Sequence, residues 1–223
     1  MGLCRMQSIF LRSLILKLAE INANELNICT QSMSGLIHNN AISHIFQPTI
    51  RTRIWCLCGH SHEETIHPIT ISLPIHETIE KSMENITAPT TLPGHICPAC
   101  GKSGGVQKSD HFQRAPIVLL ICLERSSFSP VGVVPIYTKI RYGMTLNLSP
   151  YFCDPPSDLI YQLQATTFYT GHANIRNHFT AQVLSADGIW RYCNDSNIQR
   201  LIEPKLYSRD AYLLFYSLKS PSS

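Results

Sequence analysis

Apolar residues recur at helical spacing in the first part of the chain. Residues 6–46 carry a broad apolar face, while Arg12, Lys17 and Glu20 lie on its other sides; the face is formed by Ile9, Phe10, Leu14, Leu16, Leu18 and Ile21. A second helical stretch is predicted over 23–38, beyond a break that is rich in asparagine. The pattern therefore predicts that this part of the chain is helical.

From Thr49 onward, short runs of β-branched residues broken by proline and glycine replace the helical spacing. One short helix is predicted over 75–87. Strands are predicted over 50–55, 66–73, 117–123, 133–140, 161–169 and 211–218. Because helices come first and strands later, the fold class that we expect is α+β, with a mostly antiparallel sheet.

Two strand-like runs flank an Asp187-Gly188 turn signal and form a predicted hairpin. The first run opens with His178, and the second ends in Asn194 and Asp195. A loop of two or four residues would put Asp195 on the face of His178, whereas a loop of three would put Asn194 there. Either way, an imidazole meets a group that can orient it. That pair is two parts of a Cys-His-Asn/Asp thiol protease site.

Four of the nine cysteines form two close clusters, Cys56-Leu57-Cys58-Gly59 and Cys97-Pro98-Ala99-Cys100-Gly101. Two short turns that each present two thiolates suit a tetrahedral zinc ion, and glycine tolerates the backbone conformation of such turns. His60 or His62 could replace a thiolate in the tighter first cluster. The alternative is four reduced cysteines in loops without a metal. We expect structural Zn²⁺.

Composition narrows the class of protein further. The chain is 44% hydrophobic and 15% charged, which is typical of a packed globular protein. The net charge of +3, without a basic block among aromatics, speaks against nucleic acid as a partner. Arg12 and Lys17 interrupt the only signal-like apolar run, and the apolar stretch 115–123 is too short to span a bilayer. We expect a cytoplasmic or nuclear protein with no membrane partner.

In the order of its sequence motifs, the chain resembles the ubiquitin-specific protease family over roughly residues 22–218. The family's G-H-Y/F-T-A box corresponds to 177–181, and its W-x-x-[FC]-[ND]-D-S box corresponds to 190–196. Further similar segments are 22–26, 42–46, 115–125, 142–151 and 211–216, and both cysteine clusters fall where the family has zinc-bearing fingers. The order and spacing of these motifs make the resemblance specific.

The resemblance implies a papain-like α+β cysteine protease fold, with a palm sheet, zinc-ribbon fingers and a truncated N-terminal helical thumb. It implies a thumb remnant over 1–48, fingers over 49–115, an antiparallel palm sheet over 116–218 and a tail over 219–223. His178 would be the base, Asn194 the orienting residue and Asp195 its helper. Cys56, Cys58, Cys97 and Cys100 would be the zinc ligands. The implied activity is thiol-dependent removal of ubiquitin or of a ubiquitin-like modifier such as SUMO.

The chain also departs from the family pattern. Asn177 replaces the glycine before the histidine, Ser126 replaces an aromatic residue, and the first cysteine cluster is one residue short. The family's cysteine box is missing, and only the segment 4–9 is similar to its continuation, so Cys4 is the candidate nucleophile. We therefore expect a weakly active or inactive version of the enzyme. The alternative is a non-catalytic binding module for ubiquitin or a ubiquitin-like protein, or a zinc scaffold.

Overall fold

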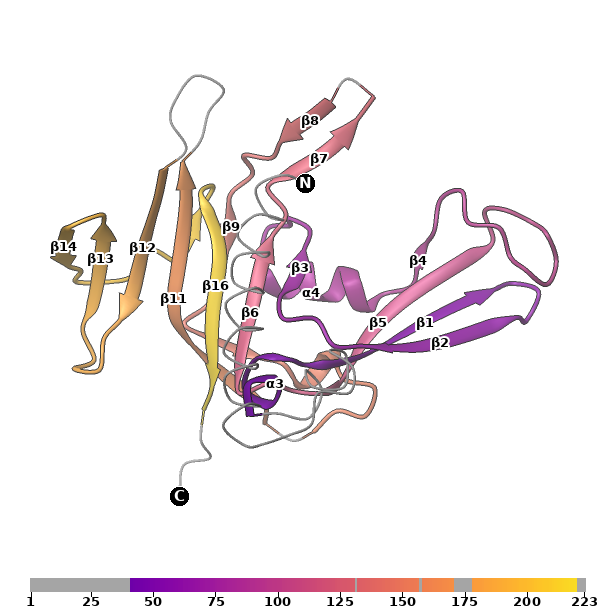
Figure 1. Ribbon diagram of the computed structural model, residues 1–223, viewed down its shortest axis with the longest axis horizontal. Helices are drawn as coiled ribbons and strands as arrows, with labels where there is room; N and C mark the ends of the chain where they lie inside the picture. The colour runs from indigo at the N-terminus through magenta and orange to yellow at the C-terminus, as the bar shows by residue number, and fades with distance from the viewer. Residues whose placement is uncertain (1–40, 131, 157, 171–177, 220–223) are drawn as a thin grey trace, which may run out of the picture.

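Two β-sheets dominate the part of the protein that the computed structural model describes, namely residues 41–130, 132–156, 158–170 and 178–219. The larger one, which we call the palm sheet, has eight strands. Its strands are β3 (Ile71–Leu73), β6 (Val118–Leu123), β10 (Thr145–Asn147), β11 (Ile160–Thr170), β12 (His178–Leu184), β13 (Trp190–Asn194), β14 (Asn197–Arg200) and β16 (Ala211–Leu218). They lie in the order β14-β13-β12-β11-β16-β6-β3 (Figure 1). The short strand β10 pairs with β11. Neighbouring strands are antiparallel except β3 and β6.

The smaller sheet, which we call the finger sheet, extends to one side of the palm sheet (Figure 1). Its four strands lie in the order β2-β1-β5-β4. They are β1 (Thr49–Cys56), β2 (Ser61–Ile66), β4 (Thr90–Thr91) and β5 (Val106–Arg114). At its inner end, Ile50 and Phe112 belong to the palm core, so the two sheets share hydrophobic residues.

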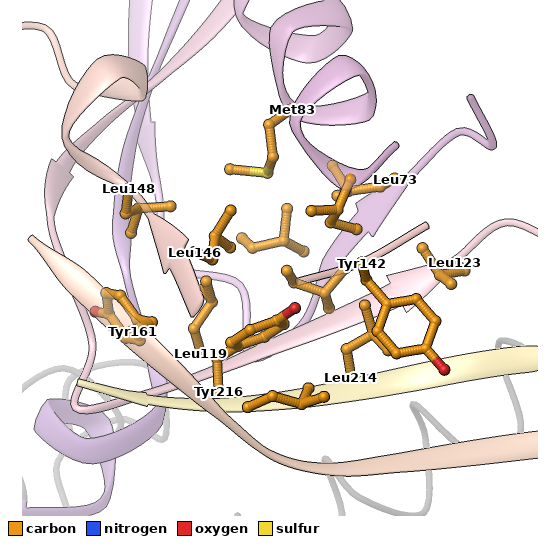
Figure 2. Close-up of a cluster of buried hydrophobic side chains, with 14 of the residues drawn as sticks. Leu73, Met83, Leu119, Leu123, Tyr142, Leu146, Leu148, Tyr161, Leu214 and Tyr216 are labelled. Carbon is orange, nitrogen blue, oxygen red and sulfur yellow. The ribbon is translucent and has the colours of Figure 1, made fainter. Parts of the chain in front are cut away.

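One face of the palm sheet packs against α4 (Ile79–Thr87) and buries the main hydrophobic core. Figure 2 shows Met83 of α4 above Leu119, Leu146 and Tyr216. The hydroxyl of Tyr216 donates to the carbonyl of Gly143 at 2.8 Å, and that of Tyr142 donates to the carbonyl of Lys205 at 2.7 Å. Large rings therefore fill this core without leaving these buried hydroxyls unpaired.

Short elements complete the described chain. They are α3 (Ala41–Phe46), the 3₁₀ helix Ser149–Tyr151, the hairpin of β7 (Ser126–Ser129) with β8 (Gly132–Pro135), and the pair of β9 (Ile140–Arg141) with β15 (Tyr207–Ser208). Arg125 donates to the backbone carbonyls of Thr138, Ser208 and Ala211 and thereby joins these segments to the palm sheet. Burial lowers the pKa of Arg125 to about 10.

Most of the predicted elements are present, with specific corrections. The strands predicted over 50–55, 117–123, 161–169 and 211–218 are confirmed as β1, β6, β11 and β16. The single strand predicted over 66–73 is wrong: β2 ends at Ile66 and β3 starts at Ile71, because Pro68 cannot donate a ladder hydrogen bond. The strand predicted over 133–140 is also wrong, since β8 ends at Pro135 and β9 begins at Ile140.

The predicted helix over 75–87 is shorter than expected. Thr78 is its N-cap, and its hydroxyl accepts the N–H of Lys81 at 3.2 Å. Residues 6–40 of the predicted N-terminal helices, and hence most of the expected thumb remnant, lie outside the described residues. The proposed division into thumb remnant, fingers, palm and tail at residues 48, 115 and 218 stays a prediction. Within the range assigned to the fingers, β3 and α4 pack with the palm sheet. No helix within the described ranges has the length and apolar character needed to cross a bilayer.

Candidate active site

The connection between β12 and β13 determines which side chain faces His178. Ala181 pairs with Cys193 and Leu184 with Trp190. Beyond that pair, the N–H of Ser185 donates to the carbonyl of Ile189 at 3.1 Å, so the loop proper is 186–188. Gly188 has a φ of +76°, which glycine adopts without strain. The loop therefore has the three-residue register, and Asn194 lies on the face of His178.

Asp187 stabilises this loop from within. Its Oδ1 accepts the N–H of Ile189 at 3.1 Å and a guanidinium N–H of Arg191 at 2.9 Å, and its Oδ2 accepts a second N–H of Arg191 at 2.6 Å. The hydrogen bonds from Arg191, followed by the one from Ile189, hold the pKa of the Asp187 carboxyl well below its usual range. The turn residue that marked the hairpin in the sequence thus also helps to fix its register.

His178 and Asn194 form a hydrogen-bonded pair at the end of the palm sheet. His178 Nε2 lies 2.7 Å from Asn194 Oδ1, and both residues are half-buried. An amide oxygen can only accept, so Nε2 is the donor in this pair, and in the neutral imidazole Nδ1 is then the free acceptor. The geometry is that of an imidazole held in one tautomer with one nitrogen left to act as a base.

Asp195 occupies a different position from Asn194. It begins the tight turn between β13 and β14, with a φ of +52°, and it is exposed. An aspartate tolerates this left-handed conformation better than most residues. Asn194, and not Asp195, contacts the imidazole in this structure.

Phe179, the residue after His178, points to the opposite face of the palm sheet and packs there in an aromatic cluster with Tyr169 and Tyr212. Phe179 lies 4.9 Å from Tyr169 and 6.1 Å from Tyr212, measured between ring centroids. On the face of His178, Thr170 is its register partner in β11 and donates its hydroxyl to the His178 carbonyl at 3.4 Å. The aromatic cluster thus packs behind the strand that carries His178, and the polar side chain of Thr170 lies on the side of the pair.

The predicted nucleophile cannot be placed beside this pair, because Cys4 lies outside the described residues. Cys193 neighbours Asn194 in sequence, but strand alternation puts its side chain on the other face. Among the described cysteines, none hydrogen-bonds to His178. The described part of the candidate site therefore contains the His178–Asn194 pair and no thiol hydrogen-bonded to it.

The four predicted cysteine ligands come together at the outer end of the finger sheet. Their Sγ atoms all lie within 4.8 Å of one another, with Cys56 to Cys100 at 3.8 Å and Cys58 to Cys97 at 3.7 Å. Four thiolates at about 2.3 Å from a zinc ion in a tetrahedron are about 3.8 Å apart. The donor set and its spacing therefore fit a tetrahedral metal ion.

Backbone groups around this cluster support thiolate chemistry. The N–H of Cys100, together with that of Ala99, stabilises the Cys97 thiolate and lowers the pKa of Cys97 to about 6. Gly59 and Gly101 follow the two cysteine pairs with φ values of +92° and +68°. His60 and His62 line the pocket next to the cluster and do not replace a thiolate.

The sequence analysis did not single out Gln182, which links the segment 201–206 to the face of His178. This amide is 1% exposed. It donates to the carbonyl of Lys205 at 2.9 Å and accepts the N–H of Lys205 at 2.8 Å. The alternation His178-Thr180-Gln182 shows that it shares that face, but the partner segment is remote in sequence.

The family model of the ubiquitin carboxyl-terminal hydrolases matches residues 10–216. This chain therefore belongs to the ubiquitin carboxyl-terminal hydrolase family of thiol proteases. This confirms the resemblance to the ubiquitin-specific proteases that the sequence motifs indicated.

Among curated relatives, ubiquitin carboxyl-terminal hydrolase 21 of Arabidopsis thaliana is 28% identical, over 80% of this chain and 25% of its own length. Ubiquitin carboxyl-terminal hydrolase 42 of Homo sapiens is 26% identical, over 78% of this chain and 14% of its own length. The chain thus spans about a quarter or less of these two relatives.

Among solved structures, the SAGA Ubp8/Sgf11/Sus1/Sgf73 DUB module bound to ubiquitin aldehyde is similar with a TM-score of 0.71. The identity is 21%, over 83% of this chain and 44% of that chain. A yeast SAGA DUB module that carries a mutant Sgf73 gives a TM-score of 0.72 at 22% identity, over 87% of this chain and 47% of that chain. These similarities confirm the predicted papain-like α+β fold.

Proposed function

We propose that this chain is a ubiquitin-specific protease domain that hydrolyses the bond after the C-terminal glycine of ubiquitin. The observation that carries the proposal is the 2.7 Å contact between His178 Nε2 and Asn194 Oδ1 in a chain of this family. Ubiquitin is the proposed modifier because similar structures include Ubp8 bound to ubiquitin aldehyde and to monoubiquitin. A cytoplasmic or nuclear location stays a prediction.

The geometry supports a thiol-dependent mechanism. His178 Nδ1 would take the proton of the attacking thiol, and the thiolate would add to the carbonyl carbon of the scissile amide. The imidazolium would then give its proton to the leaving amine, and a thioester would remain. Water, deprotonated by His178, would hydrolyse that thioester and restore the free thiol. Asn194 holds the ring throughout, and Asp195 is its proposed helper.

We propose Cys4 as the nucleophile. It begins the segment 4–9, which is similar to the continuation of the family's cysteine box. A ubiquitin probe with a C-terminal electrophile tests this assignment directly. An adduct that peptide mapping locates at Cys4, and that Cys4→Ala abolishes, would support it. An adduct that survives Cys4→Ala would exclude Cys4 but not hydrolysis.

The cysteine cluster has a structural role in this proposal. Cys56, Cys58, Cys97 and Cys100 would hold Zn²⁺, which would crosslink the ends of β1 and β5 through the adjacent loops. Metal analysis of purified protein should give close to one zinc per chain. A metal-free protein with a folded finger sheet would contradict this role.

The second candidate is a weakly active or inactive domain that binds ubiquitin without cleaving it. It is favoured by one observation: within the described ranges no thiol contacts His178. Titrating ubiquitin onto isotope-labelled protein distinguishes the candidates when combined with the probe. Shifted signals without an adduct would indicate binding alone, whereas neither shifts nor an adduct would leave only the zinc scaffold.

A further inference from the structure

A pocket of about 240 Å³, lined by both apolar and polar side chains, adjoins the His178–Asn194 pair on the same face of the palm sheet. Thr170, the register partner of His178, lines it, as does Thr180, two residues further along β12. Tyr192, two residues before Asn194, lines it too. The pocket therefore begins one side-chain step away from the catalytic pair.

The return segment from β14 to β16 forms the other wall of this pocket. Leu201, Glu203, Lys205 and Asp210 contribute to it. The backbone of Lys205 is fixed on both sides, because Gln182 bonds to its N–H and its carbonyl and Tyr142 donates to the same carbonyl at 2.7 Å. Three part-buried hydrogen bonds therefore hold this wall against the sheet.

Among the described residues that line the pocket, Lys205 is the one cation, and Glu203 and Asp210 are carboxylates. The Lys205 ammonium lies 5.4 Å from the centroid of the Phe168 ring. Lys205 therefore already occupies the position over this ring that would attract a cation from a ligand. Within the described residues, Lys205 has no carboxylate within ion-pair distance, whereas Asp210 is paired with Arg209 at 3.4 Å. Glu203 is exposed and is the one opposing charge that the described residues leave unpaired at the pocket.

The chemistry of the proposed reaction indicates what enters this pocket. The general acid must reach the leaving nitrogen within about 3 Å, so the chain that carries this nitrogen departs past His178. That chain is the acceptor protein to which ubiquitin is attached through a lysine. Residues flanking that lysine would then lie within reach of a pocket that begins one side-chain step from the pair.

We propose that this pocket is a subsite for the acceptor protein, and that Lys205 selects an acidic residue next to the modified lysine. The inference rests on the proposed ubiquitin hydrolase function. It adds a preference on the leaving-group side, carried by Lys205 and by the hydroxyls of Thr180 and Tyr192.

The test uses two conjugates in which ubiquitin is joined to a short peptide through lysine, with either Glu or Lys as the next residue. Each cleavage rate is divided by the rate on ubiquitin with a small fluorogenic C-terminal amide. A variant that merely perturbs the fold or the pair changes all rates together, so the ratio isolates the subsite. Binding of the same conjugates to the His178→Ala chain, by fluorescence polarisation, gives a readout without hydrolysis.

We expect the Glu conjugate to be favoured by about threefold, the size of an exposed ion pair. Lys205→Met should remove this preference, Lys205→Glu should reverse it, and Glu203→Gln should increase it. Lys139→Met is the matched control, because the Lys139 ammonium lies 5.3 Å from the Tyr207 ring centroid, outside the pocket. That variant should keep the preference.

Equal use of both conjugates by the unmodified protein would overturn the inference, and so would a preference that survives Lys205→Met. In both cases the hydrolase proposal would stand. No binding of either conjugate or of ubiquitin would overturn the proposed function, and the subsite with it.

Discussion

The palm sheet and the outer finger sheet differ in what stabilises them. The palm sheet buries a continuous core against α4, including Leu73, Met83, Leu119, Leu214 and Tyr216. At the outer end of the finger sheet the buried residues are Cys56, Cys97 and Val106, and all of β2 is exposed. One region is held by hydrophobic burial and the other by a cluster of metal-ligand type. The candidate catalytic pair lies on the palm sheet, apart from the four cysteines.

Truncating a side chain in the palm core should cause the largest loss of stability. Leu214 is 0% exposed and lies in the middle of the sheet. Leu214→Ala should lower the free energy of unfolding by about 2–5 kcal/mol, because it leaves a cavity. Urea denaturation measures this loss. Leu57→Ala is the control, since Leu57 is 82% exposed on the finger sheet side. Similar losses for both variants would contradict the contrast between the two regions.

Removing the metal should affect the fingers alone. Chelation, or Cys97→Ser, should reduce amide hydrogen-exchange protection over 54–56 and 106–108, because Cys56 and Val106 are the buried residues in these two ranges. Amides of β11 and β16 should keep their protection. Cys193→Ser removes a thiol outside the cluster and should leave the fingers protected. Loss of protection throughout the palm sheet would show that the two regions do not differ in this way.

Substituting Asn194 should affect catalysis and leave stability unchanged. Asn194→Ala frees the imidazole of His178, so the hydrolysis rate should fall roughly a hundredfold. Asn194→Asp retains an acceptor for Nε2 and should keep most of the rate. The midpoint of urea denaturation should be the same for both variants. If Asn194→Ala hydrolyses ubiquitin amides at the original rate, the residue does not orient the base.

Substituting Asp187 should have the smallest effect, and that effect should depend on pH. Hydrogen bonds from Arg191 lower the pKa of Asp187 in the folded protein, so its stabilising contribution is present above the unfolded value of about 4. The contribution is lost as the pH falls from there through the lower folded value. Asp187→Asn should therefore differ slightly from the unmodified protein at pH 7, and this difference should shrink below about pH 4. A difference in denaturation midpoint that does not change with pH would contradict the role of the ion pair.

Some elements could be read from local pattern and others could not. β16 matches its predicted bounds because an apolar run without proline or glycine fills it. β5 was not predicted, since its sequence VQKSDHFQR is mostly polar and its buried residues, Val106, Ser109 and Phe112, are three apart. That spacing does not follow the alternation expected of a strand. β5 lies between β1 and β4, and contacts remote in sequence determine it.

The candidate site shows the same limit. Motif similarity pointed to His178 and Asn194, but the choice between Asn194 and Asp195 depended on a loop register that several lengths would satisfy. The pocket beside them could not be predicted at all, because it requires Lys205 to return to Gln182 across 23 residues. No periodic pattern carries that information.

The most direct test of the central claim is the rate at which the chain releases a fluorophore from the C-terminus of ubiquitin, before and after His178→Gln. If Asn194 orients His178 as a general base, as we propose, thiol-dependent release should fall by roughly a thousandfold in the variant. Release at the same rate by His178→Gln, or none by the unmodified chain, would contradict the account.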